Sequence, residues 1–325
     1  MSQTYFLTGA LGCIGAWVTK TVLDQGDSPV VFDMGGDPRR LKDILSGEEL
    51  ARVKFVQGDI TDLDLVTKTM EETHANKIIH LAGLQVPFCK ADPSLGARVN
   101  VVGTVNLFEA AKRTGVERVV YASSAAVYGK DDLGAGGAAP DEDVACHPGN
   151  HYGVFKAANE GNARIFWQDD SISSVGLRPL TVYGVGRDQG LTSGPTRAMK
   201  AAVLGREFTI PFSGATDFNY VADTAATFVA SADRAPEGAH VYNLHGASVE
   251  VARIVEVIES LAPEAGRIQV DGPEIPIPPA LDGRALREAL PDLPDTPLEE
   301  GIAMTMDRFR TLHEEGRLST HDLES

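Results

Sequence analysis

The sequence contains little cysteine, little positive charge and no long apolar run, and each shortage excludes a class of protein. Three cysteines in 325 residues are too few and too irregularly spaced for a framework of disulfides. The 29 lysines and arginines are outnumbered by 46 aspartates and glutamates, and the formal net charge of −17 opposes binding to nucleic acid or to an anionic membrane. No apolar segment is long enough to span a bilayer. We therefore expect a globular cytoplasmic protein without nucleic-acid or membrane partners.

Glycine, by contrast, is concentrated near the start of the chain. The run TGALGCIG (residues 8–15) lies between an expected strand at 3–7 and an expected helix at 13–25. Glycines in such a turn let the backbone approach a dinucleotide pyrophosphate, which the N–H groups of the helix N-terminus can bind. Asp33 ends the next strand about 20 residues on, where an acid accepts hydrogen bonds from the ribose. Ordinary turns also use glycine, but this position favours a dinucleotide site.

A tyrosine and a lysine, Tyr152 and Lys156, lie one helical turn apart downstream. The lysine ammonium is expected to lower the pKa of the tyrosine phenol, which could then exchange a proton with a substrate hydroxyl during hydride transfer. Alone, such a pair is usually helix surface. Ser124, however, follows an apolar strand at the edge where parallel sheets bind ligands. Ser124, Tyr152 and Lys156 are therefore the candidate catalytic residues.

The apolar pattern predicts an α/β fold with a Rossmann-type doubly wound parallel sheet. Strands are expected at residues 29–32, 53–57, 77–81, 118–122, 174–180 and 241–244, and helices at 63–73, 93–114, 152–168, 194–204, 221–232 and 249–261, with two short helices near the end. Residues 131–149 form either a loop over the site or a plain surface loop. The residues from Arg317 onward are expected to fray.

Together these motifs resemble the extended short-chain dehydrogenase/reductases of the NAD-dependent epimerase/dehydratase kind. The resemblance runs from residue 3 to about residue 310 and includes TGALGCIG, Asp33, GDI at 58–60, HLAG at 80–83, Asn100, SSAAVYG at 123–129, the Tyr152/Lys156 pair and LRP at 177–179. It implies an NAD-binding domain of residues 1–180 plus 217–245. It also implies a smaller substrate-binding domain of residues 181–216 plus 246–325.

The resemblance further implies which residues contact the cofactor. The expected set is Gly9, Leu11, Gly12, Cys13, Ile14, Gly15, Asp33, Asp59, Ile60, Leu81, Ala82, Gly83, Asn100, Ser123, Tyr152, Lys156 and Pro179. NAD is favoured over NADP because the Asp33 charge would repel a 2′-phosphate. Arg39 and Arg40 either reach such a phosphate or begin a solvated helix.

Departures from the family pattern bear on the substrate. Members that act on nucleotide-diphosphate sugars have an asparagine and an arginine where this chain has Thr181 and Thr216, and losing the arginine removes the side chain best suited to a diphosphate. Dehydratases have an Asp-Glu pair where this chain has Ala125 and Ala126, which excludes acid–base dehydration. Arg187 could hold a carboxylate or form a surface salt bridge. The expected substrate contacts are Leu84, Gln85, Ser124, Ala125, Thr181 and Arg187.

These features predict an NAD-dependent oxidoreductase that moves hydride to or from a hydroxyl or keto carbon of a small sugar, sugar acid or polyol. The alternative is an NAD-dependent sugar epimerase that retains its keto intermediate, and a third interpretation is an inactive dinucleotide-binding sensor or scaffold. No metal is expected, because Cys146, His147 and His151 match no common zinc spacing. The resemblance also implies a homodimer that pairs through residues 93–114 and 152–168.

Overall fold

The structure, a computed structural model, describes residues 2–324 and is built around a parallel sheet. The sheet comprises β1 (Thr4–Thr8), β2 (Ser28–Asp33), β3 (Lys54–Gln57), β4 (Lys77–His80), β5 (Arg118–Ala122), β6 (Ser173–Arg178) and β10 (Ala239–Asn243). These seven strands follow the order β10-β6-β5-β4-β1-β2-β3, and every pairing is parallel. The chain changes direction across the sheet between β1 and β4, which is where a doubly wound sheet opens a crevice at its carboxyl edge.

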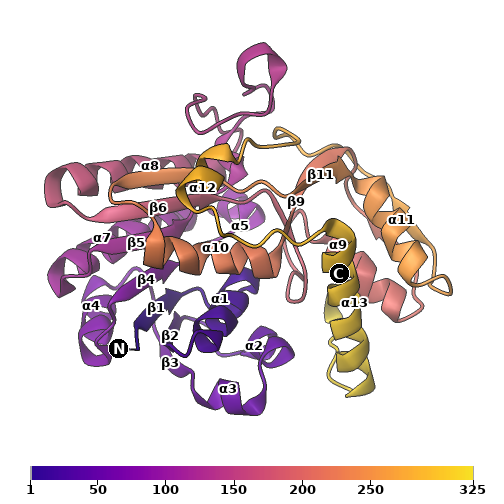
Figure 1. Ribbon diagram of the computed structural model, residues 1–325, viewed down its shortest axis with the longest axis horizontal. Helices are drawn as coiled ribbons and strands as arrows, with labels where there is room; N and C mark the ends of the chain where they lie inside the picture. The colour runs from indigo at the N-terminus through magenta and orange to yellow at the C-terminus, as the bar shows by residue number, and fades with distance from the viewer. Residues whose placement is uncertain (1, 325) are drawn as a thin grey trace.

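Helices cover both faces of this sheet (Figure 1). They are α1 (Cys13–Asp24), α2 (Arg39–Ile44), α3 (Gly47–Ala51), α4 (Leu63–Thr73), α5 (Val86–Ala91), α6 (Pro93–Ala97), α7 (Gly103–Thr114), α8 (His151–Asp170), α10 (Val221–Arg234) and α12 (Arg284–Ala289). A π-helix, η1 (Arg98–Val102), joins α6 to α7, and short 3₁₀ turns occur at η2 (Ala125–Val127) and η3 (Ala135–Gly137).

The strands are apolar throughout because both faces of the sheet are buried. Successive side chains alternate between the faces. In β1, Tyr5 and Leu7 join the core that packs against α1 and α10, whereas Phe6 joins the core under α4 and α7. All three side chains are completely buried. The alternation therefore holds the sheet rigidly between two helical layers and fixes where its carboxyl edge lies.

The C-terminal half adds two small sheets and its own core on the right in Figure 1. One sheet contains β7 (Thr181–Tyr183), β9 (Ala215–Tyr220) and β11 (Ala247–Glu250), and the other pairs β8 (Phe208–Ile210) with β12 (Ile268–Val270). Helices α9 (Gly194–Val203), α11 (Val251–Leu261) and α13 (Leu298–Glu314) pack around them, followed by a 3₁₀ turn η4 (His321–Leu323). Within residues 2–324, none of the helices has both the length and the apolar character needed to cross a membrane.

The predicted α/β doubly wound sheet is confirmed, with differences at particular elements. The strand expected at 174–180 ends at Arg178, because Pro179 has no N–H for the ladder and the chain then joins another sheet as β7. The helix expected at 93–114 is interrupted by the π-helix η1. The last helix is not short, since α13 has 17 residues.

The expectation that the chain frays from Arg317 onward is wrong for the residues that the structure describes. Lys200 Nζ lies 2.7 Å and 2.8 Å from the two carboxylate oxygens of Asp322, and both residues are buried. Lys200 Nζ also donates to the carbonyl of Ser319 at 3.2 Å. A charged pair between distant elements therefore docks the terminal turn, which local polarity alone could not reveal.

Candidate active site

A cleft of about 600 Å³ lies at the carboxyl edge of the main sheet. It brings together the glycine run, the ends of β2, β4 and β5, the start of α8 and segments of the C-terminal half. A larger cavity of about 770 Å³ lies beneath the segment 281–298. We place the candidate site in the smaller cleft, because Ser124, Tyr152 and Lys156 line the cleft and not the larger cavity.

The glycine run has the geometry that a dinucleotide pyrophosphate requires. Gly9 has a φ of +68°, and a Cβ there would lie 2.5 Å from the backbone nitrogen of Ala82. A Cβ on Gly15 would lie 2.5 Å from Cα of Ala10. Helix α1 then begins at Cys13 without a side-chain cap and without an acidic residue in its first turn. Its first N–H groups are therefore available to an anion, so this end of the cleft fits NAD.

Asp33 joins the end of β2 to this loop. Its carboxylate accepts hydrogen bonds from the backbone N–H of Leu11 at 3.1 Å and of Gly35 at 3.2 Å. The side chain also lines the cleft, where its remaining lone pairs can accept bonds from ribose hydroxyls.

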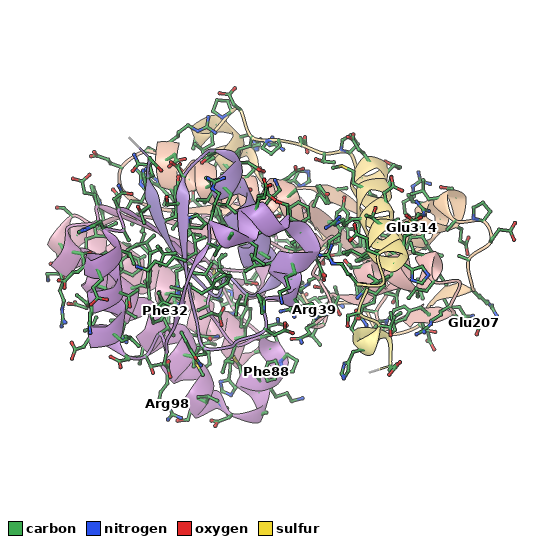
Figure 2. All side chains as sticks on the ribbon, turned by 90° about the horizontal axis from the view of Figure 1, so that it is seen from below. Phe32, Arg39, Phe88, Arg98, Glu207 and Glu314 are labelled. Carbon is green, nitrogen blue, oxygen red and sulfur yellow. The ribbon has the colours of Figure 1, made fainter. Side chains whose placement is uncertain are left out.

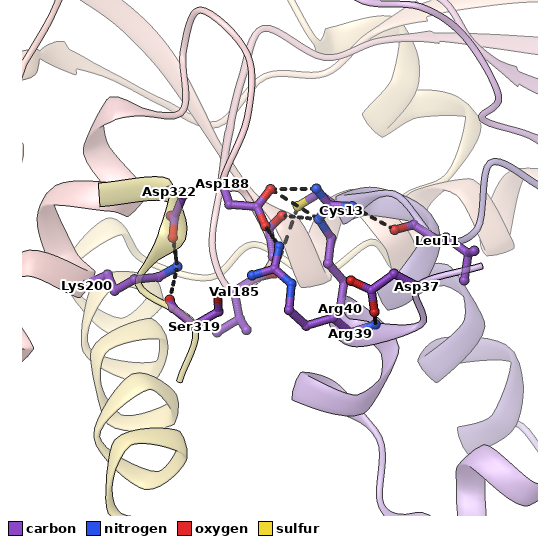
Figure 3. A network of polar contacts seen from close by, with 11 residues as sticks. Leu11, Cys13, Asp37, Arg39, Arg40, Val185, Asp188, Lys200, Ser319 and Asp322 are labelled. Atoms are coloured by element: carbon purple, nitrogen blue, oxygen red, sulfur yellow. Dashed lines mark hydrogen bonds and ion pairs between the residues drawn. The ribbon is translucent and has the colours of Figure 1, made fainter. Parts of the chain in front are cut away.

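Arg39 and Arg40 begin helix α2, as one of the two interpretations expected, but their guanidinium groups are paired and not solvated. Both donate to the buried carboxylate of Asp188, Arg39 at 2.5 Å and Arg40 at 2.6 Å, and Arg40 also donates to the carbonyl of Leu11 at 3.0 Å (Figure 3). The pair is thus engaged across the cleft with the loop after β7. The two guanidinium groups are therefore not free to bind a 2′-phosphate, which agrees with NAD rather than NADP.

Local packing brings Tyr152 to the cleft. The Asn150 side chain caps α8 by accepting from the N–H of Gly153 at 3.0 Å. Because Gly153 has no side chain, the first turn of α8 can lie against η2; a Cβ there would be 2.0 Å from the carbonyl oxygen of Ala126. The Ser124 hydroxyl, which accepts from the N–H of Ala126 at 3.1 Å, begins the same turn. The glycine therefore sets the approach of Tyr152 to Ser124.

Burial dominates the electrostatics of Tyr152. It raises the pKa of the phenol, and a hydrogen bond with Ser124 and the charge of Arg187 oppose that rise. The Lys156 ammonium donates to the carbonyl of Ala122 at 2.6 Å and lies 5.4 Å from the centroid of the Tyr152 ring. The expected lowering of the Tyr152 pKa by Lys156 is therefore not seen in this structure. Burial also lowers the pKa of Lys156 to about 8.

The π-helix holds the wall of the site beside Lys156. Asn100 lies within η1, where its side chain donates to the carbonyl of Leu84 at 2.9 Å and accepts from the Leu84 N–H at 2.7 Å. The Asn100 carbonyl accepts from the Asn159 amide of α8 at 2.8 Å. His80 is buried between Thr8 and Thr104, and burial lowers its pKa to about 3. Asn100 therefore links the loop after β4 to the helix that carries Tyr152.

A buried ion pair supports the strand end beneath Ser124. Glu160 accepts from Arg178 at 2.8 Å and 2.6 Å and from the hydroxyl of Ser123 at 2.5 Å. Arg178 also donates to the Tyr128 hydroxyl at 2.5 Å. Both members of the pair are largely buried, and the pair joins α8 to the ends of β5 and β6. This network could not be predicted from the sequence, because nothing in the local spacing of these residues distinguishes them from surface charges.

Most predicted site residues do meet in the cleft. The lining includes Gly9, Gly12, Cys13, Ile14, Gly15, Asp33, Ile60, Leu81, Ala82, Gly83, Leu84, Gln85, Ser123, Ser124, Ala125, Tyr152, Lys156, Pro179 and Arg187. Leu11 and Asn100 lie one layer behind it through the bonds described above. Asp59 accepts from the N–H of Thr61 at 2.8 Å in the turn before α4.

Thr181 does not line the cleft, contrary to the sequence-based expectation. It is completely buried, and its hydroxyl lies 2.8 Å from that of Thr216. Its neighbours Leu180 and Val182 face the cleft instead, because side chains alternate along an extended segment. The sequence analysis also missed a second wall formed by residues 275–277, a proline-containing stretch whose local pattern indicates only a connector. Among residues 2–324 no three metal-ligating side chains gather into a site.

The chain is similar to known proteins over most of its length. Residues 5–244 match the model of the NAD dependent epimerase/dehydratase family. A UDP-glucose 4-epimerase of Mycolicibacterium smegmatis is 32% identical over 317 residues, which is 94% of this chain and 97% of the relative.

Two solved structures extend the similarity to the fold. The Thermus thermophilus UDP-glucose 4-epimerase in complex with NAD is 25% identical with a TM-score of 0.78, covering 95% of this chain and 99% of that one. MoeE5 in complex with UDP-glucuronic acid and NAD is 28% identical with a TM-score of 0.79, covering 95% and 99%. The similarity thus spans both halves of the chain.

Proposed function

Because the chain belongs to the NAD-dependent epimerase/dehydratase family, we propose that it is an epimerase that inverts a hydroxyl-bearing carbon of a sugar-type substrate. The enzyme is NAD-dependent and of the extended short-chain dehydrogenase/reductase type. The observation that carries the proposal is the meeting of Ser124, Tyr152 and Lys156 in one cleft with a loop suited to a pyrophosphate. The similarity to UDP-sugar epimerases over nearly the whole chain supports epimerisation over net oxidation.

In this proposal NAD, held in the cleft, would supply the hydride acceptor and donor for the substrate carbon. The chain's own residues transfer the proton of the substrate hydroxyl. Tyr152 takes the proton of the substrate hydroxyl as that carbon becomes a ketone, and gives it back when the ketone is reduced on its other face. Ser124 donates a hydrogen bond to the same substrate oxygen. The Lys156 ammonium favours the phenolate form of Tyr152 once the substrate lies against Tyr152.

The cofactor would lie along the glycine run and the strand ends. The N-terminus of α1 would face the pyrophosphate and Asp33 the adenosine ribose, while Ala82 and Gly83 would lie along the chain toward Pro179 at the nicotinamide end. The full proposed set is the one given by the resemblance, with Leu11 and Asn100 acting from behind the lining.

Transient cofactor reduction tests this function. Protein purified with bound NAD is mixed with candidate sugars, and absorbance of the reduced nicotinamide is followed together with the stereochemistry of the recovered sugar. An epimerase gives a small burst of reduced cofactor and an inverted sugar without added NAD. Inversion that proceeds equally well with the cofactor removed would contradict the proposal.

A net dehydrogenase for a small sugar, sugar acid or polyol is the second candidate. It is favoured by the Thr181–Thr216 contact, since two neutral hydroxyls bonded to each other offer nothing to a diphosphate. The same experiment separates the two candidates. A dehydrogenase reduces added NAD in proportion to substrate consumed and yields an oxidised product, whereas an epimerase does neither.

We also propose the domain division expected from the sequence, with residues 1–180 plus 217–245 binding NAD and residues 181–216 plus 246–325 binding substrate. Strand β9 departs from this division in part, because it pairs with β7 and β11 outside the main sheet. The test is limited proteolysis with and without NAD. Cofactor should protect the first set of residues more than the second.

A homodimer is proposed on the surface formed by α5, α6, η1 and α8, which pack against one another. This surface exposes the apolar side chains Phe88, Leu95, Val102, Val154 and Ile165, and Figure 2 shows Phe88 at the surface on the same side as Arg98. Apolar side chains that are exposed together on neighbouring elements favour a protein contact there. Sedimentation of the wild type and of Val154→Glu tests the proposal: the wild type should be a dimer and the variant a monomer.

A further inference from the structure

One cation of the cleft has no acidic partner. Arg187 is half-buried in the loop after β7, and no carboxylate of residues 2–324 lies within ion-pair distance of its guanidinium. Its Nη2 donates to the hydroxyl of Thr192 at 3.0 Å, and its Nε is buried without any partner. In a chain with a formal net charge of −17, a guanidinium that stays unpaired in a cleft points to an anionic ligand. The interpretation of Arg187 as a surface salt bridge is therefore wrong.

The other cations that line the cleft are already engaged. Arg40 is held by Asp188 and by the carbonyl of Leu11. The Lys156 ammonium donates to the carbonyl of Ala122. Among the cleft residues that the structure describes, Arg187 is thus the cation left for a substrate anion.

The charge of Arg187 acts on two groups, the Tyr152 phenol and the Cys13 thiol at the start of α1. Burial raises the pKa of Tyr152 and that of the Cys13 thiol, the latter to about 12, and the charge of Arg187 opposes both. A Cβ on Gly190 would meet the Gln85 side-chain oxygen at 2.4 Å and Arg187 Nη2 at 3.3 Å. The guanidinium and the Gln85 amide therefore face the same end of the cleft, within electrostatic reach of Tyr152.

The remaining walls of the cleft, among the residues that the structure describes, carry no further cation for a nucleotide's phosphates. Thr181 and Thr216 bond to each other away from the cleft. The segment from the C-terminal half that closes the cleft is Ile275, Pro276 and Ile277, which carries no charge. A second anionic group on the substrate would be desolvated there without a partner.

From these contacts we propose that the substrate is a free sugar acid, without a nucleotide, whose carboxylate is bound by the Arg187 guanidinium with Gln85 beside it. This inference rests on the proposed function of the same site. A guanidinium that no protein carboxylate occupies can donate two parallel N–H bonds to the two oxygens of one substrate carboxylate. Binding the carboxylate at this end leaves the hydroxyl-bearing carbons near Tyr152 and Ser124.

The alternative occupant of Arg187 is the NAD pyrophosphate, and the experiment separates the two. Wild type, Arg187→Gln and Arg187→Lys are loaded with NAD and assayed with free glucuronate, galacturonate and gluconate, with free glucose and with UDP-glucuronic acid. Arg284→Gln is the matched control, because Arg284 is an exposed arginine that pairs with Asp282 away from the cleft. The affinity for NAD is measured separately by calorimetry. Thermal unfolding of the NAD-loaded protein measures how much each compound stabilises it.

We expect turnover and thermal stabilisation with a free acid and neither with free glucose. Arg187→Gln should raise KM for the acid about 10- to 100-fold while NAD affinity changes less than about twofold, since a charge-assisted bond to substrate alone is lost. Arg187→Lys should recover part of the loss, and Arg284→Gln should behave as the wild type.

Two kinds of result overturn the inference. A parallel loss of NAD affinity in Arg187→Gln assigns the guanidinium to the pyrophosphate. Turnover of UDP-glucuronic acid or of free glucose in preference to the free acids, or no response to any acid, removes the proposed substrate class. Inversion of a UDP-sugar that is lost in Tyr152→Phe would support the proposed function while it contradicts the free-acid substrate. Turnover of a free acid that persists in Tyr152→Phe would contradict the proposed function but not the assignment of Arg187 to the carboxylate.

Discussion

A phenol that is buried in a protein cleft has a raised pKa, and at Tyr152 no single neighbouring group offsets that rise. Burial raises the pKa of Tyr152, whereas its hydrogen bond with Ser124 and the charge of Arg187 lower that pKa. Lys156 is itself buried, so its pKa falls to about 8, within reach of working pH. A buried ammonium that is readily deprotonated is a pH-sensitive support for a phenolate. At the scale of single residues, the pKa of this proposed acid–base group therefore depends on burial, on a hydrogen bond and on a neighbouring charge.

The first prediction concerns Tyr152→Phe. This change removes the hydroxyl that moves the proton and keeps the ring, so kcat should fall about 100- to 10,000-fold. NAD affinity should stay nearly unchanged. Steady-state kinetics and NAD calorimetry on the same preparation measure both quantities, and retention of most of the turnover would rule out this acid–base assignment.

The second prediction concerns the ion pair under Ser123. Glu160→Ala leaves the Arg178 guanidinium buried without its carboxylate, which should lower the free energy of unfolding by about 3–5 kcal/mol. Denaturant titration measures the loss. Glu256→Ala is the control, because Glu256 forms an exposed pair with Arg253, and its change should cost less than about 1 kcal/mol. Equal losses of unfolding free energy in the two variants would show that the buried pair contributes no more to stability than the exposed pair.

At the scale of elements, a buried carboxylate joins β9 to the turn between β10 and β11. Asp217 is completely buried and accepts from the N–H of Gly246 at 2.6 Å, and it lies 2.7 Å from His245 Nδ1. The hydrogen bond to Asp217 raises the pKa of the half-exposed His245 above its usual 6.5. The charged histidine thus helps hold the turn that leads from the main sheet into the small one.

The third prediction follows from that pKa. A group whose pKa is raised on folding contributes stability that is complete below its unfolded pKa and is lost as pH rises through its folded pKa. His245→Asn should therefore lower Tm most below about pH 6.5, and the gap to the wild type should shrink as pH rises past the folded value. Thermal unfolding of the wild type and of His245→Asn over this range of pH is the measurement. A gap that is constant with pH would remove the proposed charge coupling.

Across the whole molecule, the two sides of the cleft are bound to each other. Arg39 and Arg40 from the nucleotide side hold Asp188 from the other, and the Trp17 indole donates to the carbonyl of Val185 at 2.9 Å. Figure 2 shows Arg39 between the violet N-terminal part and the yellow helix α13. Arg308 of that helix donates to the carbonyl of Asp43 at 2.7 Å. These contacts close the molecule over the start of α1, where the pyrophosphate is proposed to lie.

The fourth prediction tests this closure. Asp188→Asn leaves two arginines without their buried carboxylate, so the free energy of unfolding should fall by about 3 kcal/mol and bound NAD should dissociate faster. NAD retained after gel filtration and its dissociation rate are the measurements. Asp292→Asn, at an exposed carboxylate 4.0 Å from Arg234, is the control and should keep the wild-type rate. An unchanged dissociation rate in Asp188→Asn would show that these contacts do not limit NAD release.

Local sequence patterns were enough to predict the fold class and most of the cleft residues that are proposed to bind the cofactor. Apolar strands, the glycine run and Asp33 depend on rules of period, turn geometry and helix N-termini, and those rules act over a few residues. The positions of Ser124, Tyr152 and Lys156 relative to the ends of their strand and helix follow from the same rules. All of these residues meet where the local pattern indicated.

The partners of the charged and wall residues, in contrast, emerge from long-range packing. Thr181 turns away from the cleft toward Thr216, Asp188 engages Arg39 and Arg40, and Arg187 is left unpaired. The segment at 275–277, far along the chain, supplies the facing wall. These outcomes depend on which distant segments of the chain pack together. Ion pairs between such segments produce no periodic pattern in the sequence. The substrate end of the site is therefore a property of the packed molecule, whereas the cofactor end is a property of the local chain.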